Sequence, residues 1–378
     1  MSGPSAKNRH KNCLDISFSR GVFISKKFVF LLFGFFLISA LANAQQPVVI
    51  AIFEEGVDVY QDAINDHLWT NPGELKHNGQ DDDGNGMIDD THGVDWTVEK
   101  GNAPQGNLSD LHPQHHGTHI AAMILGAHER RFKKLPIQLM VFKYNIWDPG
   151  TSLYESLMYA QKWGVKIFNI CFTQEKVAAY TQSTIQFMPF EERQIQRIRI
   201  EKFYPNEKMD LNSAEGFNAA YLRYQTDYWK NWNQAISKIK ELRDEMLIVA
   251  ASGNANLNLN ERHIEPATLP YSNVLTVMNL DDTDQRYNDP SYGSNYGRNV
   301  VHVSARGMNI EVYGVGTLSG SSQATAKITR YCALILSEMN DFEREKMTPK
   351  ALKARLFERL PFSPSLLGTT ITGHYLKE

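Results

Sequence analysis

Three short motifs in this 378-residue chain carry residue types that together can perform acyl transfer. They contain His116 in residues 115–119 (HHGTH), Asn254 in residues 252–254 (SGN) and Ser322 in residues 320–325 (GSSQAT). A histidine can move the proton of a serine nucleophile, and an asparagine amide can donate to the oxyanion that forms when the serine attacks a carbonyl. Ser322 also opens an apolar-rich stretch, so we expect it at a helix N-terminus, where the helix dipole favours the same negative charge.

The elements that must position these residues follow an alternating pattern. Short β-branched apolar runs alternate with helical stretches, which is typical of parallel strands joined by crossover helices. We predict strands at 48–53, 137–143, 165–172, 247–251, 274–279 and 300–305, and helices at 151–163, 231–246, 322–339 and 348–360. Continuous apolar strands are usually covered on both faces, so the sequence predicts an α/β fold.

The motifs, together with residues 52–58 (IFEEGVD), resemble those of the subtilisin-like (subtilase) serine proteases, and the resemblance runs from about Val48 to the end of the chain. Residues 52–58 are similar to the strand-end Asp-Thr-Gly motif of that family, residues 115–122 to its His-Gly-Thr-His segment, and residues 320–325 to its Gly-Thr-Ser-Met-Ala-Thr turn. The resemblance implies a three-layer fold with a mostly parallel central sheet flanked by helices. It also implies a peptide or protein substrate.

The same resemblance implies a role for each site residue. Ser322 would attack the peptide bond, His116 would take and return the proton, and Glu54 would hold the imidazole in place. Asn254 and the backbone N–H of Ser322 would bind the oxyanion. His119 is expected to pack or to form a hydrogen bond rather than to react. His112, His115 and His116 form an alternative metal cluster, although no second ligand group has a recognisable spacing.

Two departures from the family pattern limit this assignment. Glu54 stands where the family has aspartate, so its carboxylate reaches His116 only if the strand or the ring shifts, and Asp58 is a carboxylate at a different motif position. After Asn169, residues 170–173 (ICFT) replace the small Ser-Leu-Gly pattern with which the family lines its substrate. Two hypotheses remain: a secreted or periplasmic serine endopeptidase, and a catalytically weakened or inactive subtilase fold that serves as a binding module. A calcium-binding adhesin would leave the histidine and serine motifs unexplained.

The N-terminus is predicted to be an export signal, residues 1–44. Lys26 and Lys27 precede the apolar run 28–41, and residues 42–44 (ANA) form a small-residue cleavage pattern. We predict a peptidase domain at residues 45–378 and no membrane span after cleavage, with an uncleaved anchor as the alternative. Only three residues separate Ala44 from the first predicted strand. Because secreted subtilases usually carry a folding prodomain there, we expect the chain to fold unaided or with a folding partner.

An acidic loop, residues 78–95, predicts a structural calcium site. Within residues 81–90 (DDDGNGMIDD), oxygen ligands at the first, third, fifth and ninth positions and glycine at the sixth match the start of a calcium-binding loop. The ligands of this prediction are Asp81, Asp83, Asn85 and Asp89. His92 stands where an EF-hand would have its bidentate glutamate, so Asp90 is the alternative residue to close the shell. A solvated acidic turn is the other interpretation.

The connection at residues 174–232 is longer than the family's ordinary one, and we predict a helical insertion beside the cleft. It carries Tyr221, Tyr224, Tyr228 and Trp232 at helical spacing, which favours a packed helix face, and Arg193, Arg197 and Arg199, which favour a solvated face. A net charge of −3 argues against a nucleic-acid partner. The two cysteines after the signal, Cys171 and Cys332, are expected to be free thiols rather than a disulfide.

Overall fold

The computed structural model describes residues 46–101, 108–110, 112–129, 135–176 and 179–377. The predicted export signal lies outside these residues. Within them, no helix has the length and apolar character needed to cross a bilayer.

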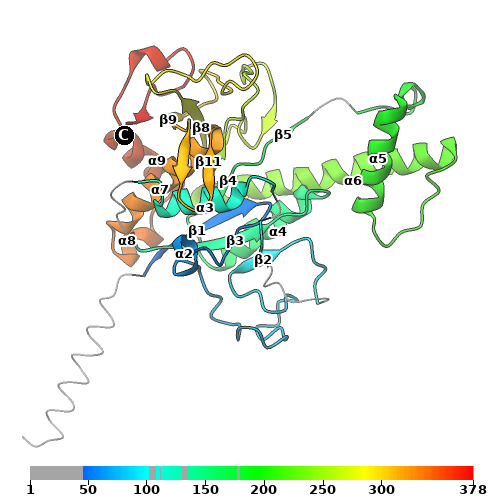
Figure 1. Cartoon of the computed structure of the whole chain (residues 1–378), viewed down its shortest axis with the longest axis horizontal. Helices are drawn as coiled ribbons and strands as arrows, with labels where there is room; N and C mark the ends of the chain where they lie inside the picture. The colour runs from blue at the N-terminus through cyan, green and yellow to red at the C-terminus, as the bar shows by residue number, and fades with distance from the viewer. Residues whose placement is uncertain (1–45, 102–107, 111, 130–134, 177–178, 378) are drawn as a thin grey trace, which may run out of the picture. The chain divides into compact units, whose positions relative to one another are not determined.

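Eight strands of the described chain form one parallel sheet in the order β12-β9-β8-β6-β4-β1-β3-β2 (Figure 1). Their bounds are β1 (Val48–Glu54), β2 (Gly93–Asp95), β3 (Ile137–Lys143), β4 (Ile167–Ile170), β6 (Leu247–Ala251), β8 (Val274–Leu280), β9 (Val303–Arg306) and β12 (Tyr375–Leu376). The α/β class predicted from the alternating pattern is confirmed, and β3 and β6 have the predicted bounds.

Helices cover both faces of the sheet because successive strand residues point to opposite sides. In β1, Ile50 and Ile52 belong to the core cluster that includes α3 (His116–Leu125) and α7 (Ser321–Ser337). The alternate residues Ala51 and Phe53 belong to the cluster with α4 (Pro149–Lys162) and α6 (Ala214–Glu241). These strand side chains are fully buried. The sheet is therefore a dry middle layer whose carboxyl-end loops are held in fixed positions.

Shorter elements complete the fold. They are α2 (Asp62–Asn65), α5 (Phe190–Phe203), α8 (Asp341–Glu345) and α9 (Pro349–Arg359), with the antiparallel pairs β10 (Ile310–Val312) with β11 (Gly316–Leu318) and β5 (Gln174–Glu175) with β7 (Ile264–Glu265). Thr348 caps α9, as the sequence suggested, by accepting a hydrogen bond from the Ala351 backbone N–H.

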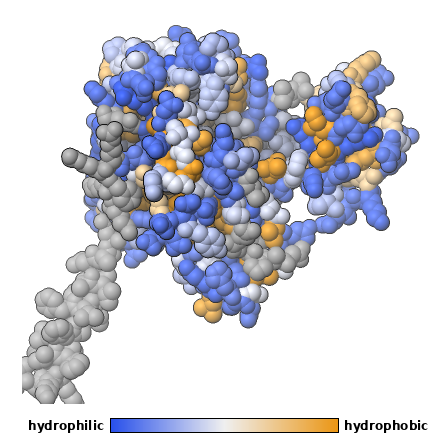
Figure 2. Space-filling model, viewed as in Figure 1, coloured by the Kyte–Doolittle hydropathy of each residue, from blue (hydrophilic) through white to orange (hydrophobic). Residues whose placement is uncertain are grey.

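One predicted helix is much longer than expected. The helix predicted at 231–246 begins at Ala214, because Ser213 caps it there by accepting from the Gly216 backbone N–H. Its second half packs on α4 and the sheet, whereas its first half packs with α5 around a separate aromatic cluster. We call α5, the first half of α6 and the segment before them the helical arm, residues 179–230. Its surface mixes apolar and polar side chains (Figure 2), and Phe187 and Phe190 are 75% and 71% exposed.

Candidate active site

The carboxylate of Glu54 and the ring of His116 are in direct contact. Glu54 is the last residue of β1 and His116 is the first residue of α3. The Nδ1–H of His116 donates to Glu54 Oε2 over 2.9 Å, and Glu54 is only 4% exposed. The second carboxylate oxygen, Oε1, is buried without a hydrogen-bond partner. The longer side chain therefore reaches the imidazole, and Nε2 is left as the basic nitrogen.

Close packing of two backbones brings this pair together. A Cβ at Gly117 would lie 2.0 Å from the Gly56 carbonyl oxygen and 2.9 Å from the Glu54 Cβ, so only glycine allows α3 to start this close to β1. Asp110 then fixes the first turn of α3, because its Oδ2 accepts from both the backbone N–H and the hydroxyl of Thr118. Thr118 Oγ1 in turn accepts from the Asp58 backbone N–H. The histidine is thus held from both sides of the helix start.

Opposing effects act on the basicity of His116. Burial alone would lower its pKa, but the charge and hydrogen bond of Glu54, with help from Asp110 and Glu55, raise the pKa above the ordinary value of 6.5. The raised pKa makes the imidazolium form easier to reach, which is what a base that accepts a serine proton requires.

Ser322 lies in the first turn of α7, as expected from the sequence. It is 7% exposed, and Gly320 at the helix N-cap has φ 153°, a conformation that favours glycine. A Cβ at Gly320 would approach Asn254 Nδ2 to 3.1 Å. The absent side chain leaves open the space in front of the first N–H groups of the helix, which have no intrahelical partners.

Asn254 is oriented by its oxygen. Asn254 Oδ1 accepts from the Ser321 backbone N–H over 2.8 Å, and Ser321 Oγ accepts from the Gly253 backbone N–H over 3.1 Å. These two contacts tie the turn after β6 to the start of α7 and leave the Asn254 amide nitrogen as a donor on the Gly320 side. Glu54, His116, Asn254 and Ser322 thus come from the ends of β1 and β6 and the starts of α3 and α7.

Other carboxylates and histidines near the motifs have structural partners. The side chain of Asp58 accepts from the Tyr60 backbone N–H and from Gln61, within its own turn. His119 Nε2 contacts the Ile310 carbonyl over 3.0 Å, as expected of a packed histidine. Among the described residues, His112, His115 and His116 do not form a cluster of close metal-ligating groups.

Cys171 and Cys332 are free thiols, as predicted. Cys171 follows β4 and its Sγ lies 3.8 Å from the Ser322 carbonyl oxygen. Burial raises the pKa of Cys171, and the charge of Glu54 raises it further. A thiol with a raised pKa is a poor nucleophile at neutral pH, so Ser322 is the better candidate in this site.

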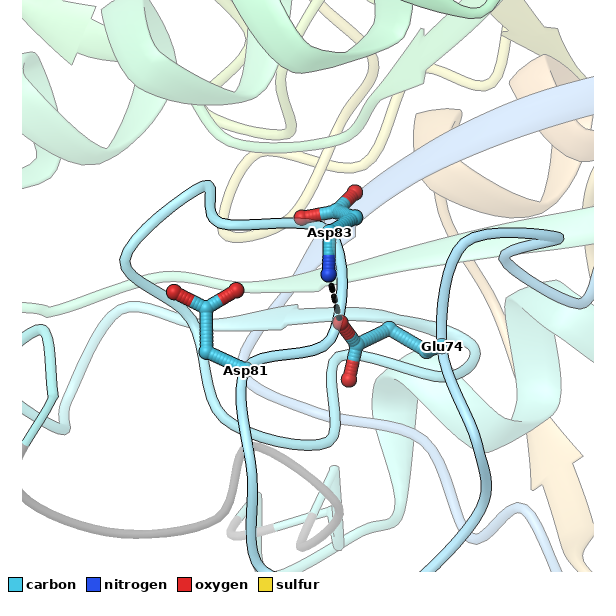
Figure 3. A group of neighbouring side chains, drawn as sticks. All are labelled: Glu74, Asp81 and Asp83. Carbon is cyan, nitrogen blue, oxygen red and sulfur yellow. Dashed lines mark hydrogen bonds between the residues drawn. The ribbon is translucent and has the colours of Figure 1, made fainter.

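The acidic loop brings together a group that only partly matches the sequence prediction. Ligand oxygens of Glu74, Asp81 and Asp83 lie within 4.8 Å of one another (Figure 3). Glu74 Oε1 accepts from the backbone N–H groups of Asp82 and Asp83, whereas its Oε2 is buried without a partner. Burial and the nearby carboxylates, opposed by these backbone hydrogen bonds, raise the pKa of Glu74.

The other predicted ligands have hydrogen-bond partners in this loop. Asp89 accepts from the backbone N–H groups of Asn78 and Gly79, and Asn85 donates to Asp90. His92 Nδ1 contacts the Trp69 carbonyl. Lys162 Nζ lies 3.3 Å from Asp83 Oδ2 and compensates one of the three carboxylates. The remaining negative charge and the orphaned oxygen of Glu74 suit a hard cation such as Ca²⁺, which prefers oxygen ligands.

Sequence reasoning missed three residues that shape the site. Glu74 precedes the aspartate run by seven positions, outside any calcium-loop spacing. Asp110 and Ser321 act through backbone groups, so no side-chain motif marks them. The only signal for Ser321 and Asp110 in the sequence was that a polar residue stands near Ser322 and near His116. A polar residue in such a place can equally well be solvated, so this signal does not identify a positioning residue.

The chain belongs to the subtilase family of serine proteases, because the sequence profile of that family matches residues 45–361. It is 22% identical over 311 residues to subtilisin-like protease 1 of Plasmodium berghei (strain Anka), covering 78% of this chain and 43% of that protein. Subtilisin-like protease 1 of Plasmodium falciparum (isolate 3D7) is 22% identical over 314 residues, covering 79% and 38%. The chain therefore spans about two fifths of the length of these relatives.

Solved structures share the fold. A chain from the assembly of the subtilase cytotoxin SubAB superposes with a TM-score of 0.56 at 20% identity, covering 88% of this chain and 87% of that one. A lanthipeptide protease gives a TM-score of 0.51 at 14% identity, with coverages of 89% and 87%. The subtilisin-like fold implied by the sequence motifs is thus confirmed.

Proposed function

We propose that this chain is an exported serine endopeptidase, secreted or periplasmic, that hydrolyses peptide bonds through an acyl-enzyme on Ser322. The observation that supports the proposal most directly is the 2.9 Å contact between His116 Nδ1 and Glu54 Oε2. A glutamate in place of aspartate was one argument for an inactive fold, and this contact weighs against that argument.

The reaction would use each residue in turn. His116 Nε2 takes the hydroxyl proton of Ser322 as Oγ attacks the carbonyl carbon, and the resulting imidazolium is stabilised by Glu54. The oxyanion accepts from the Asn254 amide and from the backbone N–H of Ser322 at the start of α7. His116 then returns the proton to the leaving amine. In the second half of the reaction, water attacks the acyl-enzyme with His116 again as the base, and the acyl group leaves Ser322.

The proposed nucleophile and base are not hydrogen-bonded to each other in this structure. Between these two described residues, no hydrogen bond joins Ser322 Oγ to the His116 ring. Catalytic hydrogen bonds are often long in substrate-free enzymes and shorten in the complex. Labelling with a fluorophosphonate tests the nucleophile, with Ser322→Ala as the matched control. We expect labelling of the wild type alone, whereas equal labelling of both proteins would favour the binding module.

We also propose a structural Ca²⁺ site in the acidic loop. Glu74, Asp81 and Asp83 would supply carboxylate oxygens, and Asn85 and Asp89 would complete or support the shell from the same loop. The buried, unpartnered Glu74 Oε2 supports this assignment, because a cation would compensate an acceptor that now lacks a partner. The ion would stabilise the long connection between β1 and α3, which carries no strand of its own before β2.

A further inference from the structure

A cavity of about 430 Å³ lies between the helical arm and the edge of the core. Aromatic side chains make up half of its lining residues, and the rest are mostly polar. The arm contributes Tyr221, Tyr224 and Tyr228 of α6, and the core contributes Trp147 and Phe172. Helix α5 contributes three polar side chains, Glu192, Gln196 and Arg199. We call it the arm cavity.

The arm cavity approaches the candidate active site at the segment that follows β4. Phe172, one of its walls, directly follows Cys171, whose Sγ lies 3.8 Å from the Ser322 carbonyl oxygen. The ring of Phe172 also packs on Tyr144 at 5.3 Å between centroids, and the Tyr144 hydroxyl donates to Glu55. An extended peptide advances about 3.3–3.6 Å per residue. A peptide bound at Ser322 would therefore need only a few residues to reach the wall formed by Phe172.

Gln196 offers an unused hydrogen-bond acceptor at this cavity. It is 4% exposed, and its Nε2 donates to Glu192 Oε1 over 2.6 Å. Its Oε1 is buried and has no partner. Leaving a buried acceptor unpaired destabilises a fold by about 1–3 kcal/mol, so such a group points to a ligand that supplies a donor, as a peptide N–H does.

Arg199 supplies positive charge without a fixed partner. Within the described part of the chain, its guanidinium forms no ion pair or hydrogen bond, and its side chain is exposed. Burial raises the pKa values of Tyr221, Tyr224 and Tyr228, and the charge of Arg199 opposes this rise in all three. The guanidinium is therefore within electrostatic reach of every tyrosine on this wall.

We propose that the arm cavity binds an aromatic or long apolar side chain of the peptide substrate, with Gln196 accepting a backbone N–H and Arg199 pairing with an adjacent acidic residue. This proposal rests on the proposed peptidase function and makes the helical arm a determinant of its specificity. The aromatic walls suit a flat or long apolar side chain, since ring-to-ring contacts add to the burial of apolar area.

Four fluorescein-labelled peptides test the proposal. Each carries one central triplet, Glu-Phe-Glu, Lys-Phe-Lys, Glu-Ala-Glu or Lys-Ala-Lys, in an otherwise identical background of alanine, glycine and serine. Cleavage is followed by mass spectrometry, and binding to the Ser322→Ala protein is followed by fluorescence anisotropy. We expect Glu-Phe-Glu to give the highest kcat/KM and the tightest binding.

Two variants assign the preference to the arm. Arg199→Glu should lower the ratio of kcat/KM for Glu-Phe-Glu to that for Lys-Phe-Lys by about tenfold, because it replaces an attractive charge with a repulsive one. Gln196→Leu should raise KM for phenylalanine peptides by about fivefold and leave kcat unchanged. Arg355→Glu is the matched control, since Arg355 is an exposed arginine on α9, and it should change neither.

The two proposals fail in different ways. If the wild type cleaves none of the peptides but Ser322→Ala binds Glu-Phe-Glu most tightly and loses that preference with Arg199→Glu, the peptidase proposal fails and the arm cavity assignment stands. The arm cavity assignment is wrong if the wild type cleaves the peptides, Arg199→Glu leaves the ratio of kcat/KM unchanged and Gln196→Leu leaves KM unchanged. Equal binding of all four peptides to Ser322→Ala also overturns it.

Discussion

The sheet that carries the candidate active site and the helical arm are built by different kinds of packing. Every strand residue from Ile50 to Phe53 is fully buried between two helical layers. The arm instead surrounds a small aromatic cluster centred on Phe217 and Tyr221, while Phe187 and Phe190 remain exposed. Buried unpartnered polar atoms also occur in the arm, on Gln196, Arg197 and Asn218.

This difference separates chemistry from recognition. Positions in a packed parallel sheet cannot shift without disturbing many contacts, so Glu54, His116 and Ser322 keep their relative geometry. The arm depends on few contacts and opens at a lower free energy, which allows its surface to vary or adapt. A long helix, α6, joins the two regions, because its second half belongs to the core cluster.

The largest expected effect comes from a substitution at Glu54, which should abolish most of the activity and leave the helical arm unchanged. Glu54→Gln removes the charge that holds the imidazole, and kcat should fall by about 10⁴-fold, as for the loss of a triad carboxylate. The pKa of His116 should also fall, because burial then acts without its main opposing charge. Since only neutral His116 is active as a base, the acidic limb of the kcat/KM profile should move to lower pH. Stopped assays from pH 5 to 9 measure both effects.

The fold provides the control for that variant. The amide oxygen of the variant can still accept from His116 Nδ1–H in place of Glu54 Oε2, so little stability should be lost and the Tm should remain within a few degrees of the wild type. A large loss of Tm together with an unshifted pH profile would mean that Glu54 is a structural residue.

A substitution that destabilises the helical arm should leave the rate of hydrolysis of a short peptide unchanged. Phe217 is fully buried in the arm cluster, with the guanidinium of Arg193 at 4.6 Å from its ring. Phe217→Ala should destabilise the arm by about 3–5 kcal/mol, as truncation of a buried phenylalanine does. Hydrogen exchange should speed up in α5 and the first half of α6 but not in β1 or β6. A fall in kcat on a short chromogenic peptide would contradict the separation of the two regions.

The sequence predicted the sheet and its active-site residues better than it predicted the helical arm. The bounds of β3 and β6 were predictable because their apolar runs end at polar residues where the chain leaves the sheet. The helical spacing of Tyr221, Tyr224 and Tyr228 indicated a packed helix in the insertion, but it could not show that these residues pack on α5 or that one helix runs on from Ala214 into the core. Catalytic residues were recognisable by type and order, whereas Asp110 and Ser321 act through backbone hydrogen bonds that only the fold creates.

Removing the proposed oxyanion donor should give an intermediate effect. Asn254→Ala deletes the amide nitrogen beside Gly320, and the loss of one such donor costs about 2.7–4 kcal/mol of transition-state stabilisation. We therefore expect kcat to fall by about 10²–10³-fold with little change in KM. Asn254 Oδ1 also accepts from Ser321, so the fluorophosphonate labelling rate must be compared with the peptide rate. A change confined to KM would place Asn254 in substrate binding instead.

Shortening the carboxylate tests how closely the site is fitted to glutamate. Because Glu54 Oε2 already lies 2.9 Å from His116 Nδ1, Glu54→Asp should draw the carboxylate away by about one bond length. A misplacement of about 1 Å can cost a hundredfold in rate, so kcat should fall by about that factor. Increased activity would show that the glutamate is a handicap and that strand β1 can move to accommodate aspartate.

The smallest expected effect is that of removing Ca²⁺ from the acidic loop. It tests whether the cation stabilises the region around His116 or the helical arm. Chelation of Ca²⁺ should lower the free energy of unfolding by about 1–3 kcal/mol, as expected for a ligand present at ten to a hundred times its dissociation constant. Glu74→Gln should abolish the response, whereas Asp66→Asn, at an exposed carboxylate outside the cluster, should retain it. Because the loop connects β1 to β2 ahead of α3, exchange should increase around His116 and not in the arm. Thermal unfolding with and without EGTA measures the shift, and a calcium response that persists in Glu74→Gln would move the site away from this cluster.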